Sequence, residues 1–216
     1  MVLEIIICLV LGYVVGSFST GYIIGHLNNV DIREMGSGNA GTTNAFRTLG
    51  KKAGIITLIG DLMKAILVLL LVRHVIYPDC EYVKLLEIIC GFGCVLGHNF
   101  PVWLKFHGGK GIAVTAGVFI VIDPWIIPVG LPLFIILVLV TKYVSVGSLA
   151  VLILFPIWNA IKFTDEKYYW AIILVSCMYT VMAFFQHRQN IVRLMNGTEN
   201  KIGQKKHVSE AVNDAE

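Results

Sequence analysis

Long apolar runs separated by short polar segments extend along the chain from Val2 to about Phe185. A helix needs about 20 apolar residues to span a bilayer. The pattern predicts an all-α integral membrane protein, with a polytopic membrane domain at 1–199 and a polar, disordered cytosolic tail at 200–216. Runs that approach the spanning length lie at 3–25, 54–77, 82–97, 125–141, 147–162 and 168–185.

The apolar stretch 112–122 cannot be assigned by length. At about 1.5 Å per residue it reaches only about 16 Å, and Asp123-Pro124, a pair that favours a turn, follows it. Residues 112–122 therefore either cross the membrane as a short helix or join 125–141 as one long kinked span.

Basic residues distinguish seven crossings from six. With seven crossings and the N-terminus outside, twelve lysines and arginines lie in the cytosol and four lie outside, namely Arg73, Lys84, Lys162 and Lys167. Six crossings would divide them eight to eight. Because cytosolic loops of membrane proteins are enriched in Lys and Arg, this rule favours seven transmembrane helices and a cytosolic C-terminus.

Composition agrees with a membrane protein. Hydrophobic residues make up 56% of the 216 residues and charged residues 14%, whereas soluble domains contain roughly one quarter charged residues. The first run lacks the basic start of a signal peptide and carries Glu4, so we expect a retained helix. The five cysteines show no CxxC spacing, which indicates neither a zinc site nor a disulfide framework.

The first long polar segment, residues 31–47, combines three glycines with small polar side chains and two arginines. Glycines expose backbone N–H groups, and such a mixture is typical of an anion-binding nest. Gly36-x-Gly38-x-x-Gly41 formally matches a dinucleotide fingerprint, but no strand precedes it. A flexible glycine spacer is the simpler alternative, although a spacer does not need Ser, Thr, Asn and Arg so close together.

The second segment, residues 97–111, ends in Gly108-Gly109-Lys110-Gly111 directly before 112–122. Backbone N–H groups, the helix dipole and an ammonium group converge there, which predicts a phosphate site. Leu104 replaces the first glycine of a Walker A loop and Gly111 stands where Ser or Thr would bind magnesium, so no nucleotide is implied. Simple anchoring at the membrane surface is the alternative, which we assign to Lys105 and not to Lys110.

The third segment, residues 187–199, continues the last apolar run. His187 and Asn190 are three residues apart and share a helical face, so both can point into one site. A capped or solvated side chain is the alternative for His187. In the short cytosolic segment 141–145, Ser145 could supply a further hydrogen-bond donor.

Two features lie inside the apolar runs. Asp61 and Lys64 fall about 10 and 15 Å from the cytosolic end of the second run. Their spacing allows pairing, which leaves a functional pair and a structural ion pair both open. In the first run, Gly12, Gly16 and Thr20 recur every four residues, a spacing that indicates close helix packing.

Together, the three polar segments resemble the bacterial acyl-phosphate:glycerol-3-phosphate acyltransferase family. The resemblance spans the membrane domain and is carried by GSGNAGTTN at 36–44, GHNFP at 97–101, KFHGGKG at 105–111 and HRQNIVRL at 187–194. It implies a seven-helix enzyme of the bacterial plasma membrane with its active site on the cytosolic side. The reaction implied is transfer of a fatty acyl group from acyl phosphate to the 1-position of sn-glycerol 3-phosphate, giving lysophosphatidic acid and inorganic phosphate.

The resemblance also implies site residues and partners. It places family site positions on Ser37, Arg47, the glycine loop with Lys110, His187 and Asn190, and it matches Glu199 to an acid tied to structural integrity. The residues themselves add candidates for phosphate binding and support: Gly38, Asn39, Thr43, Asn44, Gly108, Gly109, Gly111, Ser145, Asp61, Lys64 and His98. The implied partners are acyl phosphate, glycerol 3-phosphate and membrane lipid, with no metal, cofactor, nucleic acid, acyl-CoA or acyl carrier protein.

These residues suit the implied chemistry. Acyl phosphate is already an activated anhydride, so the protein must mainly orient the glycerol hydroxyl and stabilise developing charge. We expect direct attack without an acyl-enzyme, and His187, His98 or a substrate phosphate oxygen could take the proton. The main rival is a membrane transporter of a phosphorylated anion that uses Asp61 and Lys64, although its ligand groups should lie near the bilayer midplane.

Overall fold

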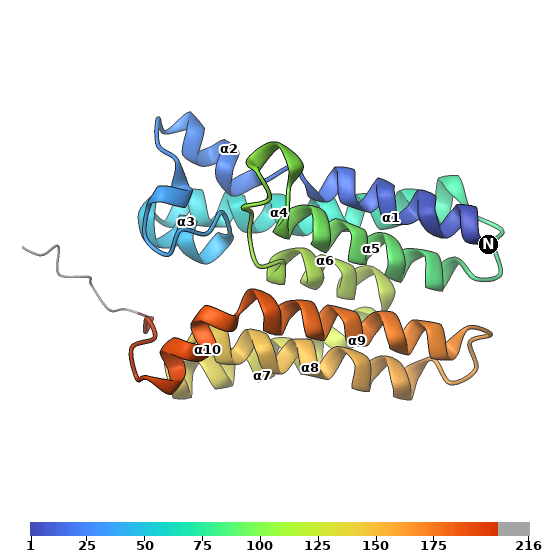
Figure 1. The fold of residues 1–216 in the computed structure, drawn as a ribbon. Coiled ribbons are helices and arrows are strands. Elements are labelled where there is room, and N and C mark those ends of the chain that lie inside the picture. Colours follow the sequence, from blue (N-terminus) through green and yellow to red (C-terminus); the bar gives the residue numbers. More distant parts are fainter. Residues whose placement is uncertain (203–216) are drawn as a thin grey trace, which may run out of the picture.

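The computed structural model describes residues 1–202, in which helices joined by short loops form the whole fold (Figure 1). The helices, with η marking 3-10 or π segments, are α1 (Val2–Gly16), α2 (Thr20–Leu27), η1 (Ile32–Glu34), α3 (Thr42–Thr48), α4 (Lys51–Leu71), η2 (Val72–Ile76), α5 (Val83–Asn99), η3 (Val102–Leu104), α6 (Ile112–Ile122), η4 (Pro124–Ile126), α7 (Ile127–Thr141), α8 (Val144–Lys162), α9 (Tyr169–Gln186) and α10 (Arg188–Met195). The described residues contain no strand, and the all-α prediction is confirmed.

Six helical segments are long and apolar enough to cross a membrane, and α6 is a shorter apolar helix. Seven crossings and the direction of insertion stay predictions. The predicted polar tail falls largely outside the described residues. Of its first residues, Ile202 donates its N–H to the Lys142 carbonyl at 2.9 Å.

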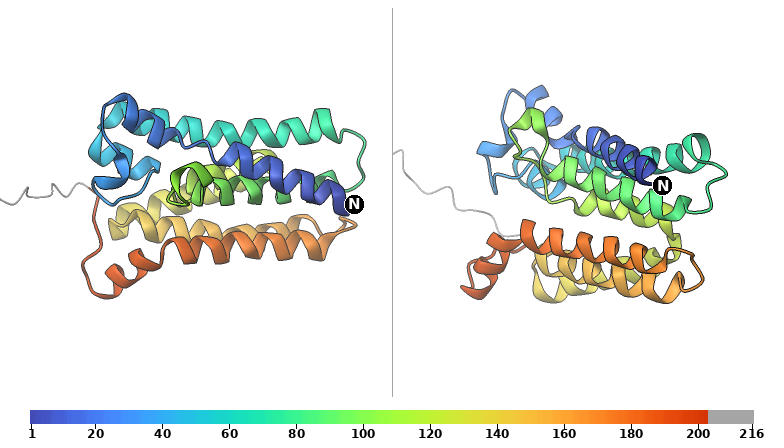
Figure 2. Two further views of the ribbon diagram at one scale, coloured as in Figure 1. Left: turned by 45° about the horizontal axis from the view of Figure 1, so that its top comes forward. Right: turned by 45° about the vertical axis from the view of Figure 1, so that its right-hand side comes forward.

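The helices are arranged in two layers, with α1, α4, α5 and α6 in one and α7, α8 and α9 in the other (Figures 1 and 2). Helix α5 is the centre of the bundle, since it packs against α1, α4, α6 and α9 and is buried along most of its length. Tyr179 of α9 joins the layers, because its hydroxyl donates to the Ile88 carbonyl of α5 at 2.8 Å.

Helix α6 runs antiparallel to α5 along its whole length. At the start of α6, the Gly109 N–H donates to the His98 carbonyl near the end of α5 at 3.0 Å. At its other end, the Lys84 ammonium group from the start of α5 donates to the Ile122 carbonyl at 3.0 Å. The chain therefore travels from one end of the bundle to the other within 112–122.

The chain reverses between α6 and α7. Asp123 forms the turn, where its carboxylate accepts from the Trp125 N–H at 3.1 Å and from the Trp158 indole N–H at 3.0 Å. Helix α7 then returns through the other layer to the end from which α6 started (Figure 1). Residues 112–122 therefore do not join 125–141 as one long kinked helix, since α6 and α7 are separate helices.

The first apolar run forms one membrane-span candidate, Val2–Leu27, in agreement with the predicted run 3–25, but its helix is interrupted. Helix α1 ends at Gly16, and the Ser17 hydroxyl donates back to the Tyr13 carbonyl at 2.7 Å. Ser19 then caps α2, since its side chain accepts from the Tyr22 N–H at 3.4 Å. Serines that bond to nearby backbone groups compete with the helical pattern, which favours the break.

Helices α1 and α5 approach each other at their glycines, as the spacing of Gly12 and Gly16 predicts. A Cβ atom at Gly12 would lie 1.9 Å from the Cys90 carbonyl oxygen, and one at Gly16 would lie 2.0 Å from that of Cys94. Only glycine fits such a crossing. Thr20, beyond the break, instead lies against Gly60 of α4.

The end of the bundle opposite the glycine loop has its own buried acid. Glu87 of α5 is fully buried and pairs with Arg73 of η2 at 2.6 Å, and Arg73 also donates to the Val121 carbonyl at 2.9 Å. Glu87 was not among the predicted functional residues. These contacts join η2, α5 and α6.

Candidate active site

Lys110 lies in the glycine loop at the N-terminus of α6. Gly111, the residue before α6, has φ +79°, a left-handed conformation that favours glycine. The first N–H groups of a helix lack intrahelical acceptors and favour anions. The Lys110 ammonium group, beside them, donates to Oδ1 of Asn190 on α10. This is its one hydrogen bond within residues 1–202, so two of its three protons are available to a ligand.

Burial lowers the pKa of Lys110 from 10.5 to about 8. The Glu199 carboxylate opposes this effect, whereas the Arg193 and Arg47 cations add to it. An anion that brings negative charge to this place would restore a preference for the charged amine. The surroundings of Lys110 are therefore suited to an anionic ligand.

His187 joins α9 to α10 and is held as a neutral imidazole. Its Nδ1 lies 2.8 Å from the Ala183 carbonyl oxygen, which can only accept, so Nδ1 carries the hydrogen and Nε2 has the free lone pair. Burial, with the Lys110 cation as the second cause, lowers the pKa of His187 from 6.5 to about 4. At neutral pH the ring therefore offers an acceptor at Nε2.

Glu199 organises the third polar segment. Its Oε1 accepts from the Asn190 amide at 2.6 Å and from the Ser145 hydroxyl at 3.3 Å, and its Oε2 accepts from Arg193 Nε at 2.8 Å. Because Nδ2 of Asn190 is bound to Glu199, its Oδ1 is turned toward Lys110. The carboxylate thus fixes which end of the amide faces the glycine loop.

The first polar segment folds around Asn44. Its amide donates to the carbonyls of Ile32 and Met35 at 3.0 Å each and accepts from the Ser37 N–H at 2.9 Å. These bonds hold the loop in shape and leave the Ser37 side chain exposed. The use of Asn44 as a phosphate ligand stays a prediction, and its observed contacts are within the loop.

Hydrogen bonds to backbone carbonyls connect the first polar segment to the second. The Ala40 N–H donates to the Gly108 carbonyl at 3.5 Å. Arg33, paired with Asp31 at 2.6 Å, donates to the Leu104 carbonyl at 3.1 Å. The first two polar segments are therefore neighbours at the same end of the bundle as α10 (Figure 1).

The structure thus separates the predicted site residues into three groups. Lys110, His187, Asn190, Ser145 and Glu199 form one cluster, which we call the Lys110 cluster. Arg47 is exposed but close enough to affect the pKa of Lys110. The first loop carries Ser37, Gly38, Asn39 and Thr43, with the Asn39 carboxamide oxygen accepting from the Gly41 N–H at 3.2 Å. The catalytic and binding roles of all these residues stay predictions.

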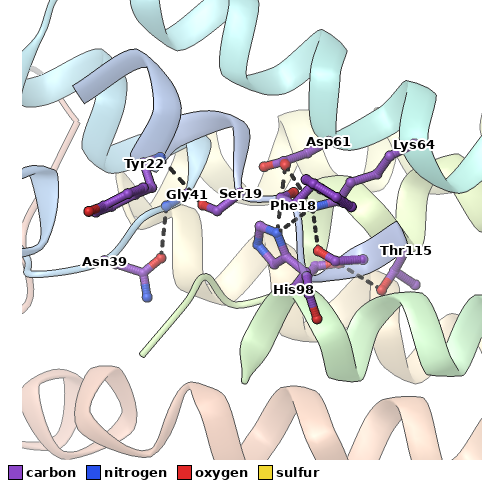
Figure 3. A network of polar contacts seen from close by, with 12 residues as sticks. Phe18, Ser19, Tyr22, Asn39, Gly41, Asp61, Lys64, His98 and Thr115 are labelled. Atoms are coloured by element: carbon purple, nitrogen blue, oxygen red, sulfur yellow. Dashed lines mark hydrogen bonds and ion pairs between the residues drawn. The ribbon is translucent and has the colours of Figure 1, made fainter. Parts of the chain in front are cut away.

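The third group is formed by Asp61, Lys64 and His98 (Figure 3). Asp61 and Lys64 pair at 3.1 Å, as their spacing predicts, and the Lys64 ammonium group lies 2.9 Å from His98 Nδ1. Of the three, His98 contacts the glycine loop at Gly109, and Lys64 and Asp61 are connected to the loop through His98.

Two side chains near these groups were not among the predicted site residues. Arg193 binds Glu199, and its place three residues after Asn190 on the same helical face was the available signal. Asn99 is 2% exposed, and neither polar atom of its side chain has a hydrogen-bond partner within the described chain. No group of three His, Cys, Asp or Glu in residues 1–202 is placed to hold a metal ion.

Known proteins are similar to this chain in sequence and in fold. A family model described as glycerol-3-phosphate acyltransferase matches residues 6–197. The chain is 42% identical over 205 residues to the glycerol-3-phosphate acyltransferase of Clostridioides difficile (strain 630), covering 93% of this chain and 97% of that protein. It is 37% identical over 199 residues to that of Bacillus subtilis (strain 168), covering 92% and 97%.

Two solved structures are similar as well. Both are of PlsY (YgiH), an integral membrane glycerol 3-phosphate acyltransferase, one in the glycerol 3-phosphate form and one in the lysophosphatidic acid form. The TM-scores are 0.80 and 0.78, each at 29% identity over 92% of this chain. The matches cover 96% and 95% of the two PlsY chains, so the similarity extends over most of each molecule.

Proposed function

The chain belongs to the glycerol-3-phosphate acyltransferase family, and we propose that it uses acyl phosphate as donor and releases lysophosphatidic acid and inorganic phosphate. Its activity is acylation of glycerol 3-phosphate, and its apolar helices make it an integral membrane protein. The proposal adds the donor, acylation at the 1-position, and a site on the cytosolic side of a bacterial cell membrane. It also adds that neither acyl-CoA nor acyl carrier protein serves as donor.

The observation that carries the proposal is the placement of cationic and N–H donors at one end of the bundle. Lys110, the first turn of α6, and Arg47 supply positive charge there, and the polar side chains of α10 face the same place. Both proposed substrates carry phosphate, and both would meet this site at the membrane surface. A transporter should instead gather its ligand groups near the middle of the membrane.

The proposed reaction is direct transfer. The O1 hydroxyl of glycerol 3-phosphate attacks the acyl carbonyl carbon, a C–O ester bond forms, and the bond from that carbon to the phosphate oxygen breaks. The electron pair of this bond leaves with inorganic phosphate. Lys110 and the α6 N–H groups stabilise the charge that develops on the leaving phosphate, which is where fixed donors accelerate a reaction most.

The proton of the attacking hydroxyl goes to phosphate in this proposal. A phosphate monoester has a second pKa of about 6, whereas the pKa of His187 is about 4 in this site. In the ligand-free site the His187 ring is the weaker base of the two, which favours the phosphate oxygen as the proton acceptor. His187, with a free lone pair at Nε2, accepts a hydrogen bond that orients the hydroxyl, and Ser37 and Asn190 contribute further polar contacts.

The direct test uses purified protein with labelled glycerol 3-phosphate and palmitoyl phosphate. We expect labelled lysophosphatidic acid and one inorganic phosphate per acyl group transferred, and no product when palmitoyl-CoA replaces palmitoyl phosphate. Product from palmitoyl-CoA alone would contradict the proposed donor.

Substitutions test the site. Ser37→Ala and His187→Ala should each reduce turnover, whereas His26→Ala, an exposed histidine of α2, should not. Wild-type transfer by both Ser37→Ala and His187→Ala would mean that the reaction takes place elsewhere.

A further inference from the structure

The ion pair Asp61–Lys64 and the ring of His98 are buried groups to which the proposed reaction assigns no step. Their side chains are between 1% and 9% exposed. They come from two helices, α4 and α5, and they touch the break between α1 and α2 (Figure 3). Charged groups inside a membrane protein are costly, so a group of this kind calls for a role.

The three protons of Lys64 are all used within the protein. Its Nζ donates to the Gly16 carbonyl at 3.0 Å, to the Phe18 carbonyl at 2.9 Å and to His98 Nδ1 at 2.9 Å. Asp61 lies 3.1 Å from Nζ and balances the charge, but its Oδ1 lacks hydrogen-bond geometry. An ammonium group has three donors and no acceptor, so none of its protons remains for a substrate.

This arrangement determines where the hydrogen of His98 lies. Because Lys64 donates to Nδ1, that nitrogen must hold a lone pair, and the ring hydrogen must be on Nε2. The nearby Asp61 oxygen, 3.6 Å from Nδ1, is too distant for a hydrogen bond that would compete. His98 is therefore a hydrogen-bond donor at Nε2 and has no free lone pair for a base.

The Nε2–H of His98 faces the glycine loop. A Cβ atom at Gly109 would lie 1.9 Å from Nε2, so the ring lies directly against the backbone next to Lys110. His98 also carries the loop through its carbonyl, which accepts from the Gly109 N–H at 3.0 Å. Within residues 1–202, Nε2 itself makes no hydrogen bond, although the residue is 2% exposed. Nε2 is not among the fully buried polar atoms of residues 1–202 that lack a partner, so it can be reached from the loop, and its N–H is free to donate to a ligand there.

Resting on the proposed function, we infer that His98 Nε2–H is a donor to a phosphate oxygen held at the glycine loop, and that Lys64 is a positioning residue that sets its tautomer. Lys64 also ties the broken first helix to α4 and α5, which keeps the ring at the loop. This assignment removes His98 from the candidates for the general base.

Two substitutions of His98 separate this role from simple structural support. Asn places an amide oxygen near the position of Nδ1 and keeps the Lys64 contact, but it lacks a donor at the loop. Gln places its amide nitrogen near Nε2 and keeps the donor, but it loses the Lys64 contact. We expect kcat/KM to fall at least tenfold further in His98→Asn than in His98→Gln, whereas a structural role predicts the reverse order.

Substitution of Lys64 tests the positioning role. Lys64→Met should lower kcat with a smaller change in KM for glycerol 3-phosphate, since the loop is still present but its donor is misdirected. Lys64→Arg should recover part of kcat. Lys52→Met, at the exposed start of the same helix, is the matched control and should behave as wild type.

The tautomer can be observed without any activity. In protein labelled with ¹⁵N-histidine, the His98 signals are those lost in His98→Gln, and we expect Nε2 protonated and Nδ1 unprotonated. Lys64→Met should change this pattern, and a His98 protonated at Nδ1 in the wild type would overturn the inference. If palmitoyl phosphate is not a donor, the proposed function fails while the tautomer result stands, so the two failures are distinguishable. Unfolding midpoints of all variants identify any that fail to fold, and for these the NMR result on the wild type decides.

Discussion

Two lysines at the same end of the bundle are used in opposite ways. Lys110 has one acceptor, Asn190 Oδ1, and two unused protons. Lys64 donates to two backbone carbonyls and to His98, and it pairs with Asp61. Both are shielded from solvent and both carry charge. The two lysines differ in the number of protons left unsatisfied and not in burial or charge alone, and this difference is why we propose Lys110 and not Lys64 as the ligand-binding lysine.

The largest effect should come from Lys110→Met, which removes the ammonium group and keeps an apolar stem. We expect kcat/KM to fall by about 10² to 10³, the usual effect of losing one donor to a developing charge. Lys105→Met, at an exposed position of the same loop, should stay near wild type. A folded Lys110→Met variant with wild-type kcat/KM would contradict the proposal that Lys110, and not Lys64, binds the ligand.

Glu199→Gln should have the next largest effect. The variant keeps the shape of the side chain but weakens its hydrogen bonds with Asn190 and Arg193. The bond to Asn190 holds the amide whose oxygen accepts from Lys110. Misplacement by about 1 Å can cost about 10²-fold in rate, so we expect a loss between about 10-fold and 10²-fold. Steady-state kinetics check this, with Glu34→Gln, an exposed acid of η1, as the control. An unchanged rate would mean that Asn190 keeps its orientation without the carboxylate.

The pH dependence of kcat/KM should report the charge of Lys110. Its pKa is lowered to about 8, so the cation is present below that pH and lost above it, earlier than for an ordinary lysine. We expect kcat/KM for glycerol 3-phosphate to fall about tenfold per pH unit above pH 8. His187, neutral above its pKa of about 4, should add no step near pH 6. A level profile up to about pH 10 would show that this charge is not needed.

The smallest effect on turnover should come from the opposite end of the bundle. Glu87→Gln removes the buried partner of Arg73 at a place where the proposed substrates do not bind. Because Arg73 is 29% exposed and can reach solvent, we expect a stability loss of about 3 kcal/mol or less. The unfolding midpoint should therefore fall while kcat of the folded protein stays at the wild-type value. A lowered kcat in the folded variant would mean that this pair is connected to the site.

Much of the fold could be predicted from hydropathy, because a helix that faces lipid must be apolar over most of its length. The turn at Asp123 and the pair Asp61–Lys64 also followed from local rules of sequence. The break after Gly16 did not. Its two serines, Ser17 and Ser19, lie in an otherwise apolar run, and Lys64, which donates to carbonyls at the break, lies far away in the sequence.

The site was predicted less completely, because local sequence patterns do not determine which side chains of different helices come into contact. The spacing of His187 and Asn190 indicated a shared face, and the glycines before 112–122 indicated a helix start. That Lys64 donates to Nδ1 of His98 depends on how α4 and α5 pack. The sequence alone therefore left His98 as a candidate base, and only the partner of its ring gives it another role.

The glycine crossing of α1 and α5 has a consequence for how this protein can change. At Gly12 and Gly16 the carbonyl oxygens of α5 occupy the space of any side chain. At these two positions α1 meets the backbone of α5 directly, so a side chain at either one would push the two helices apart. The crossing therefore fixes the position of α5, which carries His98 in its last turn, relative to α1.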